Sequence, residues 1–419
     1  MLYKFFRVVV RFSLKIFFGR IELSGLEYIK PGKAQILASN HPSGFLEPLI
    51  MACFFPRSLY FLVRGDVFEN RFLKPILVAT HQLPIYRFKD GFSKLRENRN
   101  SLQAASIVLL KKKCILIFAE GSTKCVKMLR PLQKGFMRLA ADTQQQNHDM
   151  DIEIVPVGIN FSDSTRFKSK VMLRIGKPII VDKKHILPDH PDSGEYSNNL
   201  IQTVYDAIKK NVIHLEDQTR LQSMEMAFLL EEIVHHEKLL PIVRLNVNKL
   251  DQYKKLAENI NALDKTSYQG LKDDFKLFKN ELKQVGFSLE DLKKRKPLPL
   301  SYFYLLLGIL PALTGFFIHI LPLTVAYFFT VKNVRSKEFF GSIWFVSSVV
   351  MLLIFYLLLA VFTCTGHVSL YLVPIAVLTG YFSAYYYQFM KQYDWSISKV
   401  RHFYAEKAKI LYKKYFSRL

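Results

Sequence analysis

The central motif of the chain is Ser39–Pro48, with the sequence SNHPSGFLEP. The apolar run Ile36–Ala38 before it is typical of a buried strand, and the polar residues that follow indicate a turn. His41 can accept a proton near neutral pH. Glu47 can hold the imidazole in the required tautomer and stabilise the imidazolium that forms. Taken alone, the pair also fits a capping or core histidine beside a solvated carboxylate.

The segments around this motif predict an α/β fold. Predicted strands are Ala34–Ser39, Ser58–Val63, Cys114–Phe118, Glu153–Phe161 and Val171–Ile175, and predicted helices lie around Glu47–Phe55, Phe92–Lys112 and Gly135–Asp142. Their alternation favours a mixed sheet flanked by helices, which we assign to residues 21–198. In such sheets ligands gather beyond the carboxyl ends of the strands, where His41 and Glu120 would lie.

The composition favours a membrane surface as partner. Lys and Arg number 59 against 35 Asp and Glu, a net charge of +24, and the chain has 35 Phe and 21 Tyr. This basic and aromatic balance suits a lipid surface, and no zinc-finger, RNP-like or basic-zipper pattern favours nucleic acid. Four scattered cysteines without C-x-x-C spacing predict neither a disulfide framework nor a metal site.

Residues 1–20 predict an amphipathic helix at the membrane interface. Their basic residues Lys4, Arg7, Arg11 and Lys15 are spaced by three, four and four positions, which puts them on one helical face. A signal peptide is the alternative. However, the basic residues interrupt any apolar core, and no small-residue cleavage site follows.

A charged helical region is predicted for residues 199–297, after a loop rich in Pro, Asp and Ser at 186–198. Its predicted helices are Met224–Val234, Val243–Ile260 and Leu271–Val285. The pair His235-His236 does not indicate a metal site, because adjacent helical residues point apart and no third ligand is evident.

Three apolar stretches predict transmembrane helices within residues 298–390. Phe339–Phe362 and Val368–Phe389 each suit one crossing of about 20 residues. Leu298–Val331 is longer and contains Pro311, Gly315, His319 and Pro322, which predicts a hairpin that is either re-entrant or made of two short passes.

The basic residues predict the orientation of these helices. Clusters lie at 293–296, at Lys332, Arg335 and Lys337, and from Lys391 onward, whereas the loop Thr363–His367 has no Lys or Arg. By the positive-inside rule, the clusters, the soluble domain and a basic helix at 391–419 face the cytosol. We therefore expect a multi-pass protein of the cytoplasmic membrane.

Four further motifs carry candidate site residues. Leu83–Arg87 ends in a guanidinium that suits a phosphate or carboxylate. Phe118–Thr123 places Glu120, Gly121 and Ser122 in a turn that suits a hydroxylated or phosphorylated acceptor, or a plain helix cap. The other two motifs are Leu129–Gly135, before a helix, and Ile154–Ile159, a strand whose proline fits a sheet edge or a bulge.

In order and spacing, these motifs resemble the glycerolipid acyltransferase superfamily, which includes glycerol-3-phosphate and 1-acylglycerol-3-phosphate acyltransferases. The resemblance covers about residues 30–180. It implies that His41 and Glu47 are the catalytic pair, that Arg87 binds phosphate, and that Glu120 and Gly121 belong to the acceptor site. Pro156 matches the superfamily's last motif.

The chain departs from the superfamily pattern at three points. Five residues separate His41 from Glu47 where four are usual, and the acid is Glu rather than Asp. Ala119 replaces the usual proline before the Glu-Gly pair. The basic residue often found after Glu-Gly-Thr is displaced to Lys124, so Lys124 and Arg130 join Ser122 as candidate acceptor-binding residues.

The resemblance implies transfer of a fatty acyl group from acyl-CoA or acyl carrier protein to a hydroxyl of glycerol-3-phosphate or its 1-acyl form. No cofactor and no metal are expected. Backbone N–H groups near Gly44 or Gly121 are candidates for stabilising the oxyanion. Two alternatives stay open: another acceptor, such as a lyso-aminolipid, and a non-catalytic membrane scaffold.

Overall fold

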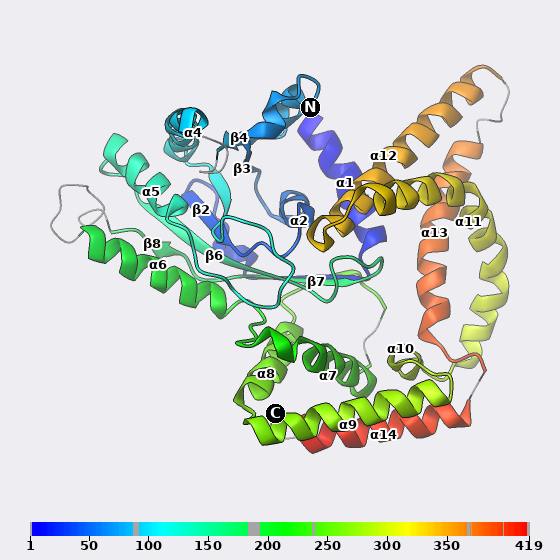
Figure 1. The fold of residues 1–419 in the computed structure, drawn as a ribbon. Helices are drawn as coiled ribbons and strands as arrows, with labels where there is room; N and C mark the ends of the chain where they lie inside the picture. Colours follow the sequence, from blue (N-terminus) through cyan, green and yellow to red (C-terminus); the bar gives the residue numbers. More distant parts are fainter. Residues whose placement is uncertain are drawn as a thin grey trace.

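The computed structural model describes residues 2–86, 92–182, 193–236, 239–366, 369, 371–396 and 398–416. A twisted sheet with helices on both faces forms one part of the molecule, and three long helices, α11 to α13, rise along one side of it (Figure 1). A group of shorter helices lies below the sheet in the same view. The predicted mixed sheet flanked by helices is confirmed.

The sheet is mostly parallel, with strands in the order β4-β3-β5-β2-β6-β7-β1-β9 and β8 paired to β6. The strands are β1 Arg20–Ser24, β2 Ala34–Ser39, β3 Leu59–Arg64, β4 Gln82–Ile85, β5 Cys114–Phe118, β6 Ile152–Phe161, β7 Lys170–Ile175, β8 Ile179–Ile180 and β9 Val243–Leu245. Strand β6 is antiparallel to β7 and β8, and the other pairs are parallel. Strands β2 and β5 therefore end at the same edge of the sheet.

Pro156 lies inside the sheet and not at its edge, and it lies opposite one extra residue between β7 and β8, in agreement with the predicted bulge. On one side of β6 it is in register with Ala38 of β2. On the other side, β8 pairs with β6 only as far as Ile154, and β7 begins its pairing at Val157. The proline, which has no N–H, occupies the position between these two partners, so no ladder hydrogen bond is lost there.

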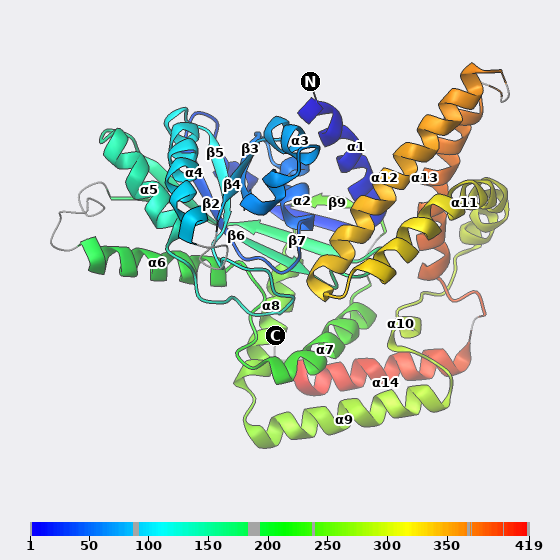
Figure 2. The same cartoon turned by 45° about the horizontal axis from the view of Figure 1, so that its top comes forward.

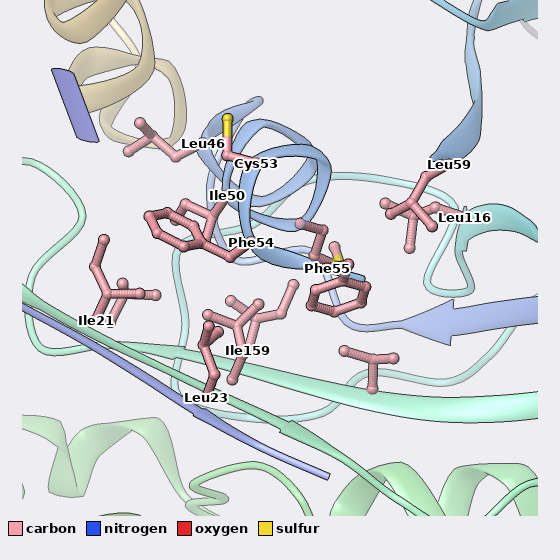
Figure 3. Packing of buried hydrophobic residues seen from close by; sticks show 14 of the residues in the cluster. Ile21, Leu23, Leu46, Ile50, Cys53, Phe54, Phe55, Leu59, Leu116 and Ile159 are labelled. Carbon is pink, nitrogen blue, oxygen red and sulfur yellow. The ribbon is translucent and has the colours of Figure 1, made fainter. Parts of the chain in front are cut away.

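Helices cover both faces of the sheet. They are α1 Leu2–Phe17, α2 Leu46–Phe54, α3 Leu73–Ala79, α4 Phe92–Leu110, α5 Gly135–Gln146 and α6 Ser193–Lys209. Side chains alternate along β2: Leu37 packs in the cluster beneath α1 and α2, whereas Ile36 and Ala38 pack with α4, α5 and α6. Figure 3 shows Ile50 and Phe54 of α2 in the first cluster. This packing fixes the start of α2 relative to the end of β2.

The helices below the sheet share a core of their own with the C-terminal helix. They are α7 Leu221–Val234, α8 Lys249–Ala262, α9 Lys265–Gln284, α10 Leu289–Leu292 and α14 Lys399–Phe416. Helix α14 lies beside α9 in both views (Figures 1 and 2) and buries Ala408, Tyr412 and Phe416 in the shared core. Helix α14 thus packs as part of the helical region.

The predicted helix Val243–Ile260 is wrong at its start. Val243–Leu245 form strand β9, which pairs in parallel with β1 through Ile21 and Val243. Helix α8 begins only at Lys249. The open edge of β1 provides backbone partners that the local sequence does not reveal, so a helix-compatible segment becomes an edge strand.

Three long helices follow: α11 Pro299–Asn333, α12 Lys337–Cys364 and α13 Leu372–Gln392. The predicted hairpin is wrong, because α11 is one helix that continues through Pro311 and Pro322. It bends in Figure 1, as helices do at proline. Its two halves also pack on different neighbours, since Gly315 lies against α13 and Thr330 bonds Ser347 of α12.

Two of the described helices, α11 and α12, are long and apolar enough to cross a membrane. Only 22% and 6% of their most apolar stretches are buried, so neither resembles the core helix of a soluble protein. Helix α13, which contains most of the third predicted span, does not meet the same criterion. Its C-terminal half contains Tyr385, Tyr386, Tyr387 and Gln388.

Candidate active site

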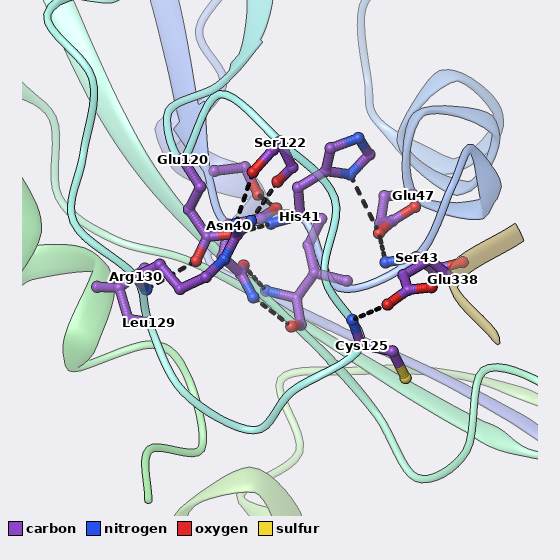
Figure 4. A network of polar contacts seen from close by, with 12 residues as sticks. Asn40, His41, Ser43, Glu47, Glu120, Ser122, Cys125, Leu129, Arg130 and Glu338 are labelled. Carbon is purple, nitrogen blue, oxygen red and sulfur yellow. Dashed lines mark hydrogen bonds and ion pairs between the residues drawn. The ribbon is translucent and has the colours of Figure 1, made fainter. Parts of the chain in front are cut away.

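His41 and Glu47 lie together where strand β2 leads into helix α2 (Figure 4). Nδ1 of His41 is 3.4 Å from Oε1 of Glu47, whose side chain is fully buried, whereas 13% of the His41 side chain is exposed. The N–H of Ser43 donates a hydrogen bond to the same oxygen. Glu47 lies in the first turn of α2, where the helix dipole favours a carboxylate. The one extra residue in the loop between His41 and Glu47 therefore does not move their side chains apart.

The imidazole of His41 is also held from the side. It stacks on the ring of Phe118 at the end of β5, with ring centres 3.8 Å apart and planes 9° apart. Ser39 and Phe118 are in register in the β2–β5 pair, which fixes this approach. With Nδ1 turned to Glu47, Nε2 lies at the opposite edge of the ring.

Glu120 connects the motifs that the sequence singled out. Its carboxylate accepts hydrogen bonds from the backbone N–H of His41 at 3.0 Å and of Arg130 at 2.9 Å. The guanidinium of Arg130 donates to it at 2.7 Å. Glu120 is only 6% exposed, so its carboxylate mainly bonds groups of the protein itself. It holds the His41 loop and the Arg130 loop together.

The remaining described candidates surround Glu120. Arg130 donates from Nη1 to the Ser122 hydroxyl at 2.7 Å. Gly121 adopts a φ of 68°, which favours glycine. Lys124 is exposed, and its backbone N–H donates to the carbonyl of His41 at 3.1 Å. Arg87 lies outside the described residues. Every other candidate is thus brought to one edge of the sheet.

Comparison with known proteins places this region in a family. The Acyltransferase family model matches residues 20–160. Residues 20–160 form a domain of the glycerolipid acyltransferase superfamily. The predicted resemblance is confirmed for this domain, which includes β1 to β5, most of β6 and the whole His41–Glu120 network.

Similar proteins are much longer than the segment that they share with this chain. The chain is 26% identical over 166 residues to glycerol-3-phosphate O-acyltransferase 2 of Saccharomyces cerevisiae, covering 39% of this chain and 22% of that one. It is 26% identical over 140 residues to an acyltransferase of Schizosaccharomyces pombe, covering 33% and 21%. The chain thus spans about a fifth of the length of these relatives.

A solved structure also resembles the chain. It is the 1-acyl-sn-glycerophosphate acyltransferase PlsC from Thermotoga maritima, which is 15% identical, with a TM-score of 0.35. The match covers 49% of this chain and 81% of that one.

Helix α12 contacts the His41 loop of the acyltransferase domain, which the sequence did not reveal. The Ser342 hydroxyl accepts a hydrogen bond from the N–H of Phe45 at 3.0 Å and lies 3.2 Å from the Ser43 hydroxyl. A Cβ on Gly44 would meet the Phe339 ring at 2.5 Å, so this approach requires glycine. Nearly 300 residues separate the two segments, and no local pattern in the sequence connects them.

Two predicted oxyanion donors are already engaged. The N–H of Gly44 donates to the carbonyl of Glu338 at 2.7 Å, and the N–H of Gly121 donates to the carbonyl of Phe118 at 3.1 Å. The N–H groups of Gly44 and Gly121 themselves are therefore not free to stabilise an oxyanion in this conformation, and the role of neighbouring N–H groups stays a prediction. The Gly44 N–H is bonded because α12 packs closely on the loop, and the Gly121 N–H is bonded within a tight turn.

A small polar cavity of about 200 Å³ adjoins the His41 loop. Asn40 and Pro42 line it, together with Lys127 and Lys337. Burial lowers the pKa of Lys127, whose ammonium donates to the carbonyl of Phe161 at 2.8 Å. The Asn40 side chain bonds both the N–H and the carbonyl of Ile159, which anchors the loop to β6.

A metal site was not expected from the sequence. Among the described residues, no three or more His, Cys, Asp or Glu side chains are grouped so that they could hold a metal ion.

Proposed function

We propose that the protein transfers a fatty acyl group from acyl-CoA or acyl carrier protein to a hydroxyl of glycerol-3-phosphate or 1-acylglycerol-3-phosphate. The observation that carries the proposal is the His41–Glu47 pair, 3.4 Å apart, with the carboxylate fully buried. It lies in a domain of a superfamily that performs such transfers. A carboxylate in this position favours the imidazolium form that a general base reaches during the reaction.

In the proposed reaction the acceptor alcohol is itself the nucleophile. Its oxygen attacks the thioester carbonyl carbon while its proton passes to Nε2 of His41. The tetrahedral intermediate then collapses, the carbon–sulfur bond breaks, and the proton on His41 passes to the leaving thiolate. The products are an ester and a free thiol, so no acyl-enzyme and no cofactor are needed.

Glu47 and Phe118 have supporting roles in this mechanism. Glu47 stabilises the imidazolium through Nδ1, and its burial makes this attraction stronger than it would be in water. Stacking on Phe118 limits rotation of the ring, so that Nε2 keeps one direction toward the acceptor.

We assign the acceptor phosphate to Arg87, with Lys124, Arg130 and Ser122 as further candidates. Lys124 is exposed next to the His41 loop, which supports this role. Arg130 is tied to Glu120, so we expect it to shape the acceptor site with Gly121 more than to act as a mobile clamp.

We also propose that the protein is membrane-bound, with the acyltransferase domain facing the cytosol. The mostly exposed apolar surfaces of α11 and α12 support membrane insertion. The basic cluster at Lys332, Arg335 and Lys337 supports the orientation, since it directly precedes or begins α12, whose first turns contact the His41 loop. Lysolipid acceptors and products would then enter and leave through the bilayer.

The test uses purified membranes, a labelled long-chain acyl-CoA or acyl carrier protein, and a panel of acceptors, with wild type beside His41→Ala. Labelled lysophosphatidate or phosphatidate in the wild type alone supports the proposal. Label only in another lipid, such as an acylated lyso-aminolipid, keeps the chemistry and changes the acceptor. No His41-dependent product with either donor would overturn the enzymatic proposal in favour of a scaffold.

A further inference from the structure

A second, larger cavity lies away from the candidate active site. Its volume is about 860 Å³, and it lies between the end of α1, the segment 240–243, and helices α11 and α13. Its wall is mainly apolar and includes Leu240, Val243, Pro311, Leu378 and Phe382. The size is within the range of ligand sites in proteins, about 300–1,000 Å³. None of the catalytic candidates lines it.

The apolar residues of this wall suit hydrocarbon chains. Pro311 belongs to α11, which is long and apolar enough to span a membrane. Water binds weakly in an apolar cavity of this kind, because the wall offers few hydrogen-bond partners. The chains of a lipid would bury the same surface favourably.

Lys15 supplies a positive charge at this apolar site. It lies near the end of α1 and is the one charged residue among the described residues that line the cavity. No described residue forms an ion pair with it. A lysine beside an apolar cavity matches a ligand with an anionic head and apolar chains.

A second ammonium lies close to the same wall. Nζ of Lys168 is 5.1 Å from the ring centre of Tyr385, which lines the cavity, and 5.0 Å from that of Phe167. The backbone N–H of Lys168 donates to the carbonyl of Phe17, two residues after Lys15, so the two lysines belong to neighbouring backbone segments.

The Lys168 ammonium is buried without an anion. Its nitrogen has no hydrogen-bond partner in the described part of the chain, and burial lowers the pKa of Lys168 to about 7. A buried ammonium with only aromatic neighbours is costly, and a phosphate beside it would offset that cost.

We propose that this cavity binds one anionic glycerophospholipid from the bilayer, with its acyl chains against the apolar wall and its phosphate between Lys15 and Lys168. The bound lipid would connect α1, the edge strand β9 and the helices α11 and α13. The site is separate from the acyl-transfer centre, so its occupant is a structural lipid and not the acceptor.

The experiment is native mass spectrometry of the full chain in non-ionic detergent, made in the His41→Ala background so that acyl transfer does not interfere. Phosphatidylglycerol and phosphatidylcholine with the same acyl chains are titrated in parallel. We expect a one-to-one adduct with phosphatidylglycerol that forms at roughly tenfold lower concentration than the phosphatidylcholine adduct.

Two variants test the residues of the site. Lys15→Gln with Lys168→Gln is expected to weaken phosphatidylglycerol binding roughly tenfold or more. The control, Lys4→Gln with Lys30→Gln, removes the same charge at two exposed positions away from the cavity and is expected to bind as before. Equal losses in the two double variants would mean general attraction to anionic lipid and would overturn the proposal.

A third variant tests the cavity itself. Leu378 lines the cavity and is 68% exposed, so Leu378→Trp reduces the available space without repacking a core. Leu357→Trp on α12, where the leucine is 66% exposed, is the matched control. Loss of the adduct in the first variant alone supports the proposal, and an unchanged adduct in both contradicts it.

Discussion

The hydroxyl of Ser342 accepts a hydrogen bond from the backbone N–H of Phe45, with 3.0 Å between oxygen and nitrogen. Through this bond the first turns of the apolar helix α12 contact the loop that carries His41. Ser342 is fully buried, and the same hydroxyl lies beside that of Ser43, whose N–H binds Glu47. The conformation of the His41 loop therefore depends on a helix that is long and apolar enough to cross a membrane.

We expect Ser342→Ala to lower kcat roughly tenfold while KM for the acceptor changes little. The substitution leaves the part-buried N–H of Phe45 without its acceptor, at a cost of about 1 kcal/mol, and loosens the loop that carries His41. Steady-state kinetics at a temperature well below the lowered Tm would identify a positioning role if kcat falls while KM does not. Ser347→Ala is the control, because Ser347 lies on the same helix but bonds Thr330 instead of the loop. An equal loss of kcat in the control would contradict this role.

Glu47→Gln is expected to lower kcat by about 10²–10⁴-fold with a small change in stability. The amide keeps the size of the side chain but no longer favours the imidazolium. Glu47→Asp should retain part of the activity, since the charge stays while the shorter side chain moves away from Nδ1. The measurement is kcat across pH, with the exposed Glu27→Gln as control. Near-normal turnover in Glu47→Gln would rule out the paired mechanism.

Glu120→Gln is expected to lower both stability and activity. The substitution removes the partner of a largely buried guanidinium and weakens the link to the His41 N–H. Breaking a buried pair costs about 3–5 kcal/mol, so a fall in Tm of several degrees should accompany the loss of activity. Thermal unfolding and kinetics on the same samples test this. A rise in acceptor KM alone, at unchanged Tm, would instead assign Glu120 to substrate binding only.

The stability of the helical region should fall in acid because of Glu232. Burial alone would raise the pKa of this carboxyl, but Lys170 at 2.8 Å and Lys293 at 2.9 Å outweigh burial and lower it. A lowered folded-state pKa stabilises the protein above the ordinary Glu value, about 4.3, and the contribution is lost as pH falls below it.

The corresponding measurement is Tm from pH 7 to pH 3 for wild type and Glu232→Gln. We expect the variant to be less stable at pH 7 and the difference to shrink below about pH 4. Glu258→Gln, at an exposed position of α8, should differ little from wild type throughout. A difference that stays constant with pH would show that the ionised form of Glu232 is not what stabilises the fold.

Local sequence was sufficient where the interacting groups lie close along the chain. Strands Ala34–Ser39 and Cys114–Phe118 have the predicted bounds, because each is a short apolar run between polar turns. His41 and Glu47 are six positions apart, so a strand, a loop and a helix start bring them together. The order of the motifs likewise indicated the superfamily without any tertiary information.

Tertiary structure decided what depends on contacts between distant segments. Val243 becomes a strand because it reaches the free edge of β1, and α11 stays one helix because two other helices support its halves. Sequence placed Glu120 at the acceptor site, whereas in the fold its carboxylate joins two loops. The contact of Ser342 with the His41 loop could not be predicted from local sequence, since nearly 300 residues separate Ser342 from Ser43. Short-range patterns specify strands, turns and motifs, but only packing determines which buried donor meets which acceptor.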